Sequence, residues 1–284
     1  MPFQKDIYTK NIDNPAENPY ATWLRHTDEK DLLLARLPAI FQRMRFSQSP
    51  RFPRDFPAVG RDPANGGGSP VPARRILGIG DGTGHTAIRI LQLLDDLQIP
   101  FHYTATDPYQ EQLDVFKTYS VAPNRANITF HPVPLNEIGP STEPYDLVIA
   151  SHSLYYVPDW PTSIPHLLSL GKETLIVHHG PRGIHQFHQR YRPFVHPGEH
   201  VISTYKDLAR HLPETGFTSF PSTVNVAPCH DPNSQDGRNL LTFFLERDFD
   251  ELPQYAQDEI RFWFRTRFPE TMTHDVGIFV AQRT

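Results

Sequence analysis

Short apolar runs alternate with amphipathic stretches along the middle of the chain. The runs that favour β-strands span residues 75–79, 101–106, 128–130, 147–150 and 174–177. The stretches with helical spacing span residues 87–97, 110–119, 162–170 and 204–212. Strands and helices in alternation predict a mostly parallel sheet covered by helices on both faces, with ligand sites at the carboxyl ends of the strands.

Two later strands are predicted at residues 218–227 and 276–281, which would bring the sheet to seven strands. Between them, residues 240–267 have helical spacing and carry many aromatic side chains. Rings at this spacing are typical of a packed core, but some of them, including Phe243, could instead line a substrate pocket. The expected fold is therefore α/β with a helical, aromatic insertion for the substrate.

The amino-terminal part of the chain is expected to add a helical segment. Residues 22–45 place apolar side chains at helical spacing, and Pro38 predicts a kink or a split within them. Residues 47–72 hold six prolines and four glycines, which is typical of a linker or surface loop. We therefore expect a helical cap over the substrate pocket at 1–46, a linker at 47–72 and a main domain at 73–284, with lid and substrate insertions near 180–200 and 228–275.

A glycine-rich turn joins the first predicted strand to the helix after it. Glycines stand at alternate positions, Gly78, Gly80, Gly82 and Gly84, so the backbone can turn sharply and approach a ligand closely. The dinucleotide pattern G-x-G-x-x-G is absent, because Thr83 and His85 occupy the place of its third glycine, and this disfavours a nicotinamide oxidoreductase. The spacing matches instead the turn of class I methyltransferases, whose cofactor is S-adenosylmethionine.

Asp107 follows the second predicted strand directly. An acid at this point can accept hydrogen bonds from both hydroxyls of a ribose, although it could equally cap the next helix. The glycine turn and the acid together favour a nucleoside cofactor.

Several segments resemble histamine N-methyltransferases in order and spacing. They are 107–112 (DPYQEQ), 145–149 (YDLVI) and 154–157 (LYYV) in the middle of the chain, and 24–29 (LRHTDE), 37–40 (LPAI) and 237–244 (GRNLLTFF) towards its ends. The resemblance covers nearly the whole length. It implies a Rossmann-like class I methyltransferase fold, a small-molecule acceptor and a monomer.

The resemblance also implies which residues hold the cofactor. Positions matching Gly80, Asp107, Gln112 and Ser151 contact S-adenosylmethionine in that family. One departure stands out, because many class I enzymes carry an acid for the methionine amine where this chain has Gly78. The amine is therefore expected to find another acceptor here.

For the methyl acceptor, the resemblance points first to Glu29, which matches a glutamate that recognises the substrate, although it could be an ordinary charge at a helix start. Aromatic walls are implied at Tyr20, Tyr155 and Tyr156. His152 stands in place of a glutamine of the family, and His274 stands near the place of an asparagine. Ile184 and His188 stand where the family has two tryptophans. These changes suggest an acceptor other than histamine. Glu29, His152 and His274 are the candidate catalytic residues, as bases or orienting groups, with a plain polar wall as the alternative for the histidines.

Six of the 15 histidines lie between residues 178 and 200. His185 and His188 would share a helix face and could bind a metal, but no acid or cysteine cluster accompanies them and methyl transfer from a sulfonium needs no Lewis acid. We therefore expect no metal and interpret the segment as a lid.

The composition narrows the function further. The formal net charge is −5, and no basic stripe indicates a nucleic-acid partner. No apolar run is long enough for a membrane span, the start lacks a secretory signal, and the single cysteine, Cys229, fits a reducing compartment, so we expect a cytoplasmic protein. The leading prediction is methyl transfer to a nitrogen of a small molecule. The alternatives are O-methylation of a small natural product and a cofactor-binding fold without methyl transfer.

Overall fold

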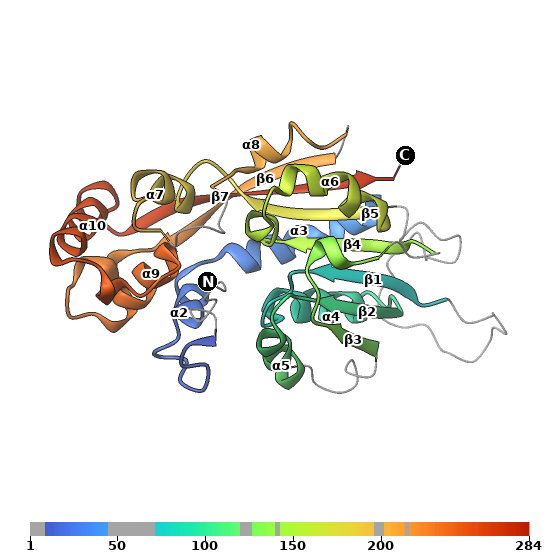
Figure 1. Ribbon diagram of the computed structural model, residues 1–284, viewed down its shortest axis with the longest axis horizontal. Helices are drawn as coiled ribbons and strands as arrows, with labels where there is room; N and C mark the ends of the chain where they lie inside the picture. Colours follow the sequence, from blue (N-terminus) through green and yellow to red (C-terminus); the bar gives the residue numbers. More distant parts are fainter. Residues whose placement is uncertain are drawn as a thin grey trace, which may run out of the picture.

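The computed structural model describes residues 9–44, 72–119, 127–139, 143–195, 202–213 and 216–283. Within them lies a seven-stranded sheet in the order β3-β2-β1-β4-β5-β7-β6 (Figure 1). The strands are β1 (Arg74–Ile79), β2 (Phe101–Thr106), β3 (Ile128–His131), β4 (Tyr145–Ser151), β5 (Gly171–His179), β6 (Gly216–Asn225) and β7 (Thr271–Gln282). All seven predicted strands are present, with small differences at their ends.

The first five strands are parallel, and β7 runs antiparallel between β5 and β6. The connecting helices are α4 (His85–Asp96), α5 (Gln110–Tyr119), α6 (Trp160–Ser169), α7 (Ile184–Arg190) and α8 (Tyr205–Leu208). Only α8 is much shorter than predicted, and Leu208 is the one buried residue of its four. The expected class I methyltransferase fold is confirmed.

Alternate residues of each central strand pack into different cores, because successive side chains of a strand point to opposite faces. On β1, Ile76 joins the core under α4 and α5, whereas Leu77 joins the core under α6. The helix α3 (Glu29–Arg43) packs into the first of these cores through Leu33, Leu37 and Phe41. The amino-terminal segment is thus built into one face of the sheet.

The break in the amino-terminal helix lies elsewhere than predicted. Helix α2 (Pro19–His26) ends before Thr27, and α3 continues through Pro38 without a split. Thr27 forms a bridge with Val224 of β6, and the Asp28 carboxylate accepts a hydrogen bond of 2.7 Å from the Thr223 amide. Pairing with the sheet edge therefore sets the break, while the buried face of α3 offsets the cost of roughly 3 kcal/mol of an internal proline.

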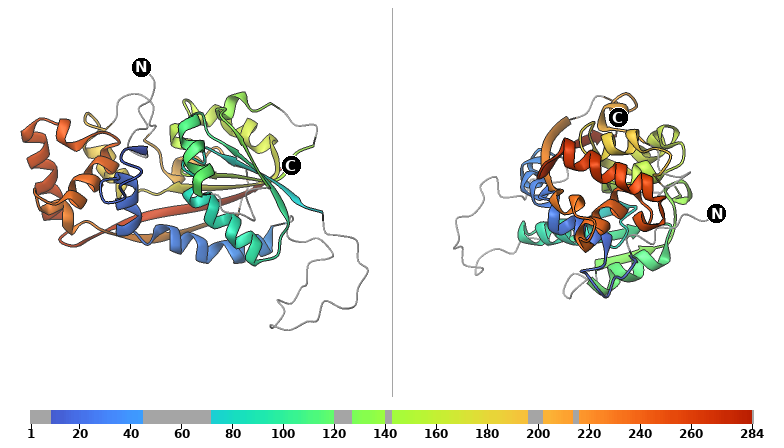
Figure 2. Two further views of the ribbon diagram at one scale, coloured as in Figure 1. Left: turned by 90° about the horizontal axis from the view of Figure 1, so that it is seen from below. Right: turned by 90° about the vertical axis from the view of Figure 1, so that its left-hand side faces the viewer.

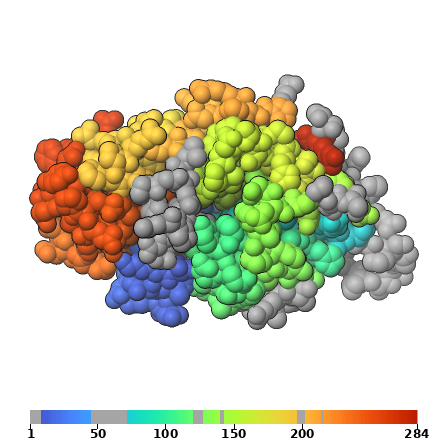
Figure 3. Space-filling model, viewed as in Figure 1, coloured from blue at the N-terminus to red at the C-terminus, as the bar shows by residue number. Residues whose placement is uncertain are grey.

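A third core lies beyond the carboxyl ends of the parallel strands, where α7, α9 (Gln235–Leu245) and α10 (Gln254–Arg267) gather (Figures 1 and 2). The predicted helical stretch at 240–267 is thus two helices. Phe244, Phe249 and Phe264 are fully buried in the core as expected, and Phe243 and Trp263 pack against it, whereas Tyr255 and Phe262 are exposed. Helix α2 packs on α9, and the space-filling view shows the amino-terminal segment (blue) against this C-terminal part (orange) (Figure 3).

Most of the predicted linker at 47–72 lies outside the described residues, as do residues 196–200 of the predicted lid. Within the parts of the chain that the structure describes, no helix is both long and apolar enough to cross a bilayer.

Candidate functional site

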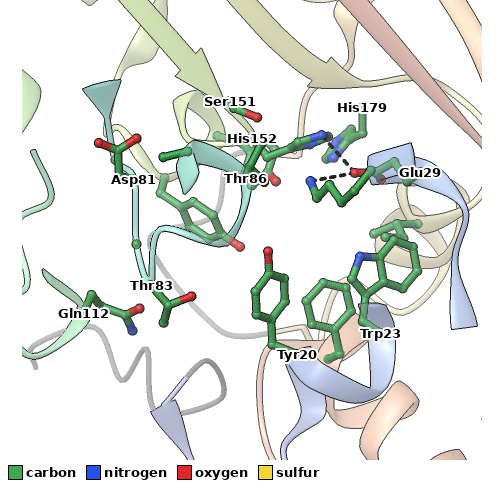
Figure 4. Close-up of a pocket in the computed structure, with 18 of the residues that line it drawn as sticks. Tyr20, Trp23, Glu29, Asp81, Thr83, Thr86, Gln112, Ser151, His152 and His179 are labelled. Atoms are coloured by element: carbon green, nitrogen blue, oxygen red, sulfur yellow. Dashed lines mark ion pairs between the residues drawn. The ribbon is translucent and has the colours of Figure 1, made fainter. Parts of the chain in front are cut away.

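A pocket lies at the carboxyl ends of β1 and β4, between the sheet and the third core (Figure 4). Its empty space, with open solvent at the mouth included, is about 1040 Å³. The predicted site residues that line it are Tyr20, Glu29, Gly80, Gly82, Gln112, Ser151, His152, Tyr155, Tyr156, Ile184, His188, Phe243 and His274. Gly78, Gly84 and Asp107 lie behind this lining.

The glycine turn forms the cofactor side of the pocket. Gly80, Gly82 and Gly84 have φ values of 64°, 58° and 78°, a left-handed conformation that side-chain-bearing residues rarely adopt. At Gly80 the approach is also close, because a Cβ there would lie 2.6 Å from Cβ of Ser153. The glycines are therefore required by the backbone and by packing, and they leave main-chain groups accessible to a ligand.

Asp107 lies beneath this turn and is fully buried. Its Oδ2 accepts a hydrogen bond of 3.0 Å from the Gly82 amide, and its Oδ1 accepts one of 3.0 Å from the Tyr109 amide. The side chain thus ties the turn after β1 to the start of α5. Contact of Asp107 with the ribose stays a prediction, and what the structure adds is a role in holding the glycine turn in place.

Asp81 is a pocket residue that the sequence analysis did not single out. Its Oδ1 accepts a hydrogen bond of 2.8 Å from the Tyr103 hydroxyl, and both residues line the pocket. Burial raises the pKa of Asp81 to about 8, with a smaller contribution from Asp107, against the hydrogen bond from Tyr103.

On the opposite side of the pocket from Asp81, Glu29 is the centre of a buried polar cluster (Figure 4). Its Oε1 lies 2.8 Å from Lys30 Nζ and 3.2 Å from His152 Nε2, and its Oε2 lies 3.1 Å from His274 Nε2. Lys30, also missed by the sequence analysis, is buried beside it. The structure thus brings the three predicted catalytic residues together in one cluster.

The surroundings of Glu29 and His152 determine their protonation states near neutral pH. Burial alone would raise the pKa of Glu29, but the charge of Lys30 and the contacts with His152 and His274 hold it well below its usual value. The pKa of His152 is lowered by burial and by Lys30, against the attraction of Glu29. Near neutral pH the cluster therefore contains an ionised carboxylate and a neutral His152.

His152 follows β4 in a constrained conformation. Its φ is 53°, in the left-handed region, and its amide donates to the carbonyl of Val177 on β5 at 2.9 Å. Non-glycine residues held in this region cost free energy and cluster at functional sites. The end of β4 thus directs an imidazole at Glu29.

Aromatic rings wall the acceptor side. Phe243 stacks on Tyr20 at 6.0 Å and on Trp23 at 4.9 Å between ring centroids, and Trp23 meets the His274 ring edge-on at 5.9 Å. The sequence analysis had interpreted Trp23 only as an apolar helix position. The wall favours a flat, apolar acceptor body.

The remaining predicted residues also border the pocket. Tyr155 stacks on His179 at 4.8 Å, and the Tyr156 hydroxyl donates to Glu246 Oε1 at 2.8 Å. His188 Nε2 donates to the Phe244 carbonyl at 2.7 Å, which joins α7 to α9. Among the residues that the structure places, no group of histidine, cysteine, aspartate and glutamate side chains has an arrangement that could hold a metal ion.

Comparison with known proteins gives the class of this site. The family model for a methyltransferase domain matches residues 29–219. A solved structure from Bacillus halodurans C-125, whose methyltransferase assignment is provisional, is 12% identical and superposes with a TM-score of 0.51, covering 74% of this chain and 92% of that one. It shows the same fold.

Two other solved structures are less similar. The YcgJ protein of Bacillus subtilis is 12% identical with a TM-score of 0.49, covering 75% of this chain and 93% of that one. Magnesium protoporphyrin IX methyltransferase from Synechocystis, with bound S-adenosylhomocysteine, is 15% identical with a TM-score of 0.40, covering 72% and 74%. No curated protein matches, so the comparisons do not support a histamine N-methyltransferase subfamily. The chain belongs to the methyltransferase-domain family, as a class I S-adenosylmethionine-dependent methyltransferase.

Proposed function

We propose that this enzyme transfers the methyl group to a nitrogen of a small, flat amine or imidazole-type molecule other than histamine. The observation that carries this proposal is the buried Glu29 carboxylate, flanked by His152 and His274 and bordered by stacked rings. A nitrogen acceptor is protonated or carries N–H groups, which are the partners that carboxylates and neutral imidazoles bind best.

The cluster suits the handling of a proton. A carboxylate only accepts hydrogen bonds, so in this proposal the Nε2 atom of the neutral His152, which faces Glu29, carries the proton, and its second ring nitrogen is then an acceptor. Nε2 of His274 faces the other carboxylate oxygen. His152 in this form can take a proton from an incoming nitrogen, and Glu29 stabilises the imidazolium that results.

S-adenosylmethionine supplies an electrophilic methyl group when bound. The chain's own contribution is to hold the acceptor's lone pair in line with that group and to exclude water. In this proposal the glycine turn, Gln112 and Ser151 hold the nucleoside, and Tyr20, Trp23 and Phe243, which line the same pocket, hold the acceptor body.

O-methylation is the second candidate, and Lys30 is the observation that favours it. Its pKa is raised, because the attraction of Glu29 and Tyr20 outweighs burial, so it stays charged and could stabilise a phenolate. A methyl-transfer screen with methyl-labelled S-adenosylmethionine would compare imidazoles and aryl amines with phenols of the same ring size. We expect transfer to the nitrogen compounds, with the label on nitrogen by NMR. Transfer to phenols alone would contradict the proposal.

The acid side of the pH profile should report His152. Since its pKa is lowered, the base form persists below the ordinary histidine pKa of about 6.5, and kcat/KM should fall only below that pH. The replacement Lys30→Met removes the charge of Lys30, which is the second cause of the lowered His152 pKa. The fall of kcat/KM on the acid side should therefore begin at a higher pH. The measurement is kcat/KM against pH with the acceptor from the screen.

Lys172→Met is the matched control, because Lys172 pairs with Asp146 at the opposite end of β5 and is exposed. Its profile should overlay that of the unmodified enzyme. If Lys30→Met does not change the pH at which kcat/KM falls on the acid side, a group other than His152 controls that fall.

A further inference from the structure

The space beside Gly78, at the end of β1, is filled by side chains from two other positions. A Cβ built at Gly78 would overlap the Tyr103 hydroxyl and both carboxylate oxygens of Asp81, of which Oδ1 would be 2.5 Å away. A side chain at position 78 therefore has no room. The carboxylate of Asp81 already lies where an acid at that position would begin.

Asp81 is held firmly in this orientation. Its amide donates to the Thr106 carbonyl at 2.9 Å, and Tyr103, which is 1% exposed, donates to its Oδ1 at 2.8 Å. Its other oxygen, Oδ2, is shielded from solvent and has no hydrogen-bond partner among the described residues. Asp81 thus lines the pocket with its carboxyl group folded towards Gly78 and with one acceptor atom that no described residue uses.

No lysine, arginine or histidine of the described chain forms an ion pair with Asp81. Glu29, across the pocket, already has Lys30 as its cation. The titratable neighbours of Asp81 are Tyr103 and Asp107, and neither supplies a positive charge near neutral pH. A buried acid of this kind is stabilised in its ionised form by a cationic ligand.

We propose that Asp81, positioned by Tyr103, binds the ammonium of the cofactor's methionine moiety and takes over the role of the acid that is absent at Gly78. Two cations could bind in this pocket, the ammonium of the cofactor and a protonated acceptor. Asp81 belongs to the glycine turn, whereas the acceptor wall is on the opposite side, so the ammonium of the cofactor is the cation expected at Asp81. The proposal concerns the cofactor alone, so the nature of the acceptor does not affect it.

Calorimetric titration with two ligands tests this proposal. S-adenosylhomocysteine carries the ammonium, whereas 5′-methylthioadenosine has the same nucleoside without the amino-acid part. For Asp81→Asn we expect affinity for S-adenosylhomocysteine to fall about 10- to 100-fold and affinity for 5′-methylthioadenosine to change less than about twofold. An equal loss for both ligands would place Asp81 at the nucleoside and overturn the proposal, as would no loss for either.

Asp95→Asn is the matched control, because Asp95 is exposed on α4, and it should leave both affinities unchanged. Tyr103→Phe removes the hydroxyl that positions the carboxylate and should weaken S-adenosylhomocysteine selectively, by less than Asp81→Asn does.

The unmodified protein offers a second test that needs no variant. Because the pKa of Asp81 is raised to about 8, the group is mostly protonated at pH 7, and pairing with an ammonium should release close to one proton. Calorimetric titrations in buffers of different ionisation enthalpy measure how many protons are released on binding. Binding of 5′-methylthioadenosine should release none, and proton counts that are the same for the two ligands would contradict the proposal.

Discussion

Glu29→Gln is expected to lower kcat/KM for the acceptor at least about 100-fold, while affinity for S-adenosylhomocysteine stays within about twofold. The amide keeps the size of the carboxylate but removes the negative charge that faces His152 and His274 and that would stabilise an imidazolium at His152. Loss of a positioned acid-base group typically costs a factor of 10² to 10⁴. Steady-state kinetics with the acceptor and calorimetry with S-adenosylhomocysteine measure the two quantities.

The loss of kcat/KM in Glu29→Gln has to be separated from a loss of folding stability. The glutamine leaves the buried charge of Lys30 without its partner, and removing one member of a buried pair costs about 3–5 kcal/mol. The double variant Glu29→Gln with Lys30→Met removes both charges and should recover much of the melting temperature without recovering turnover. If turnover returns together with stability, Glu29 acts on folding and not on the acceptor.

Asp107→Ala is expected to weaken S-adenosylhomocysteine binding about 100-fold and to lower the melting temperature by several degrees. The fully buried carboxylate satisfies the amides of Gly82 and Tyr109. Each donor left unsatisfied costs about 1–3 kcal/mol, and the glycine turn loses its anchor. Calorimetry well below the melting temperature measures affinity on folded protein.

Asp114→Ala provides the comparison for that variant. Asp114 is an exposed residue of α5, and its partners are Gln110 and Lys117 on the same helix. Its loss should change neither the affinity nor the melting temperature noticeably. An Asp107→Ala protein that binds the ligand as tightly as this control would show that the turn keeps its shape without the carboxylate.

The sheet and the cofactor turn could be predicted from sequence because local pattern determines both. The central strands β1 and β4 carry continuous buried apolar runs, and alternate glycines leave few backbone choices in the turn. β2 and α5 also have the bounds expected from the chain. The family model covers residues 29–219, which include the turn and the ends of β1 and β4.

Other features depend on contacts between distant positions. The break after α2 is set by Val224 of β6, and no local signal near Pro38 contains that information. Lys30 and Trp23 read as ordinary helix residues until the fold places them against His152 and Phe243. Asp81 had a usable signal, since it is an acid within the glycine turn, but its folding back over Gly78 depends on the Tyr103 hydroxyl.

The bridge between Thr27 and Val224 joins the two ends of the chain beside the acceptor wall. Tyr20, Trp23 and Glu29 come from one end, and Phe243 and His274 from the other, whereas the cofactor side comes from the middle. On the function proposed above, mutations in the two terminal segments would alter the aromatic wall for the acceptor and leave the glycine turn unchanged, whereas His152 varies with the middle of the chain.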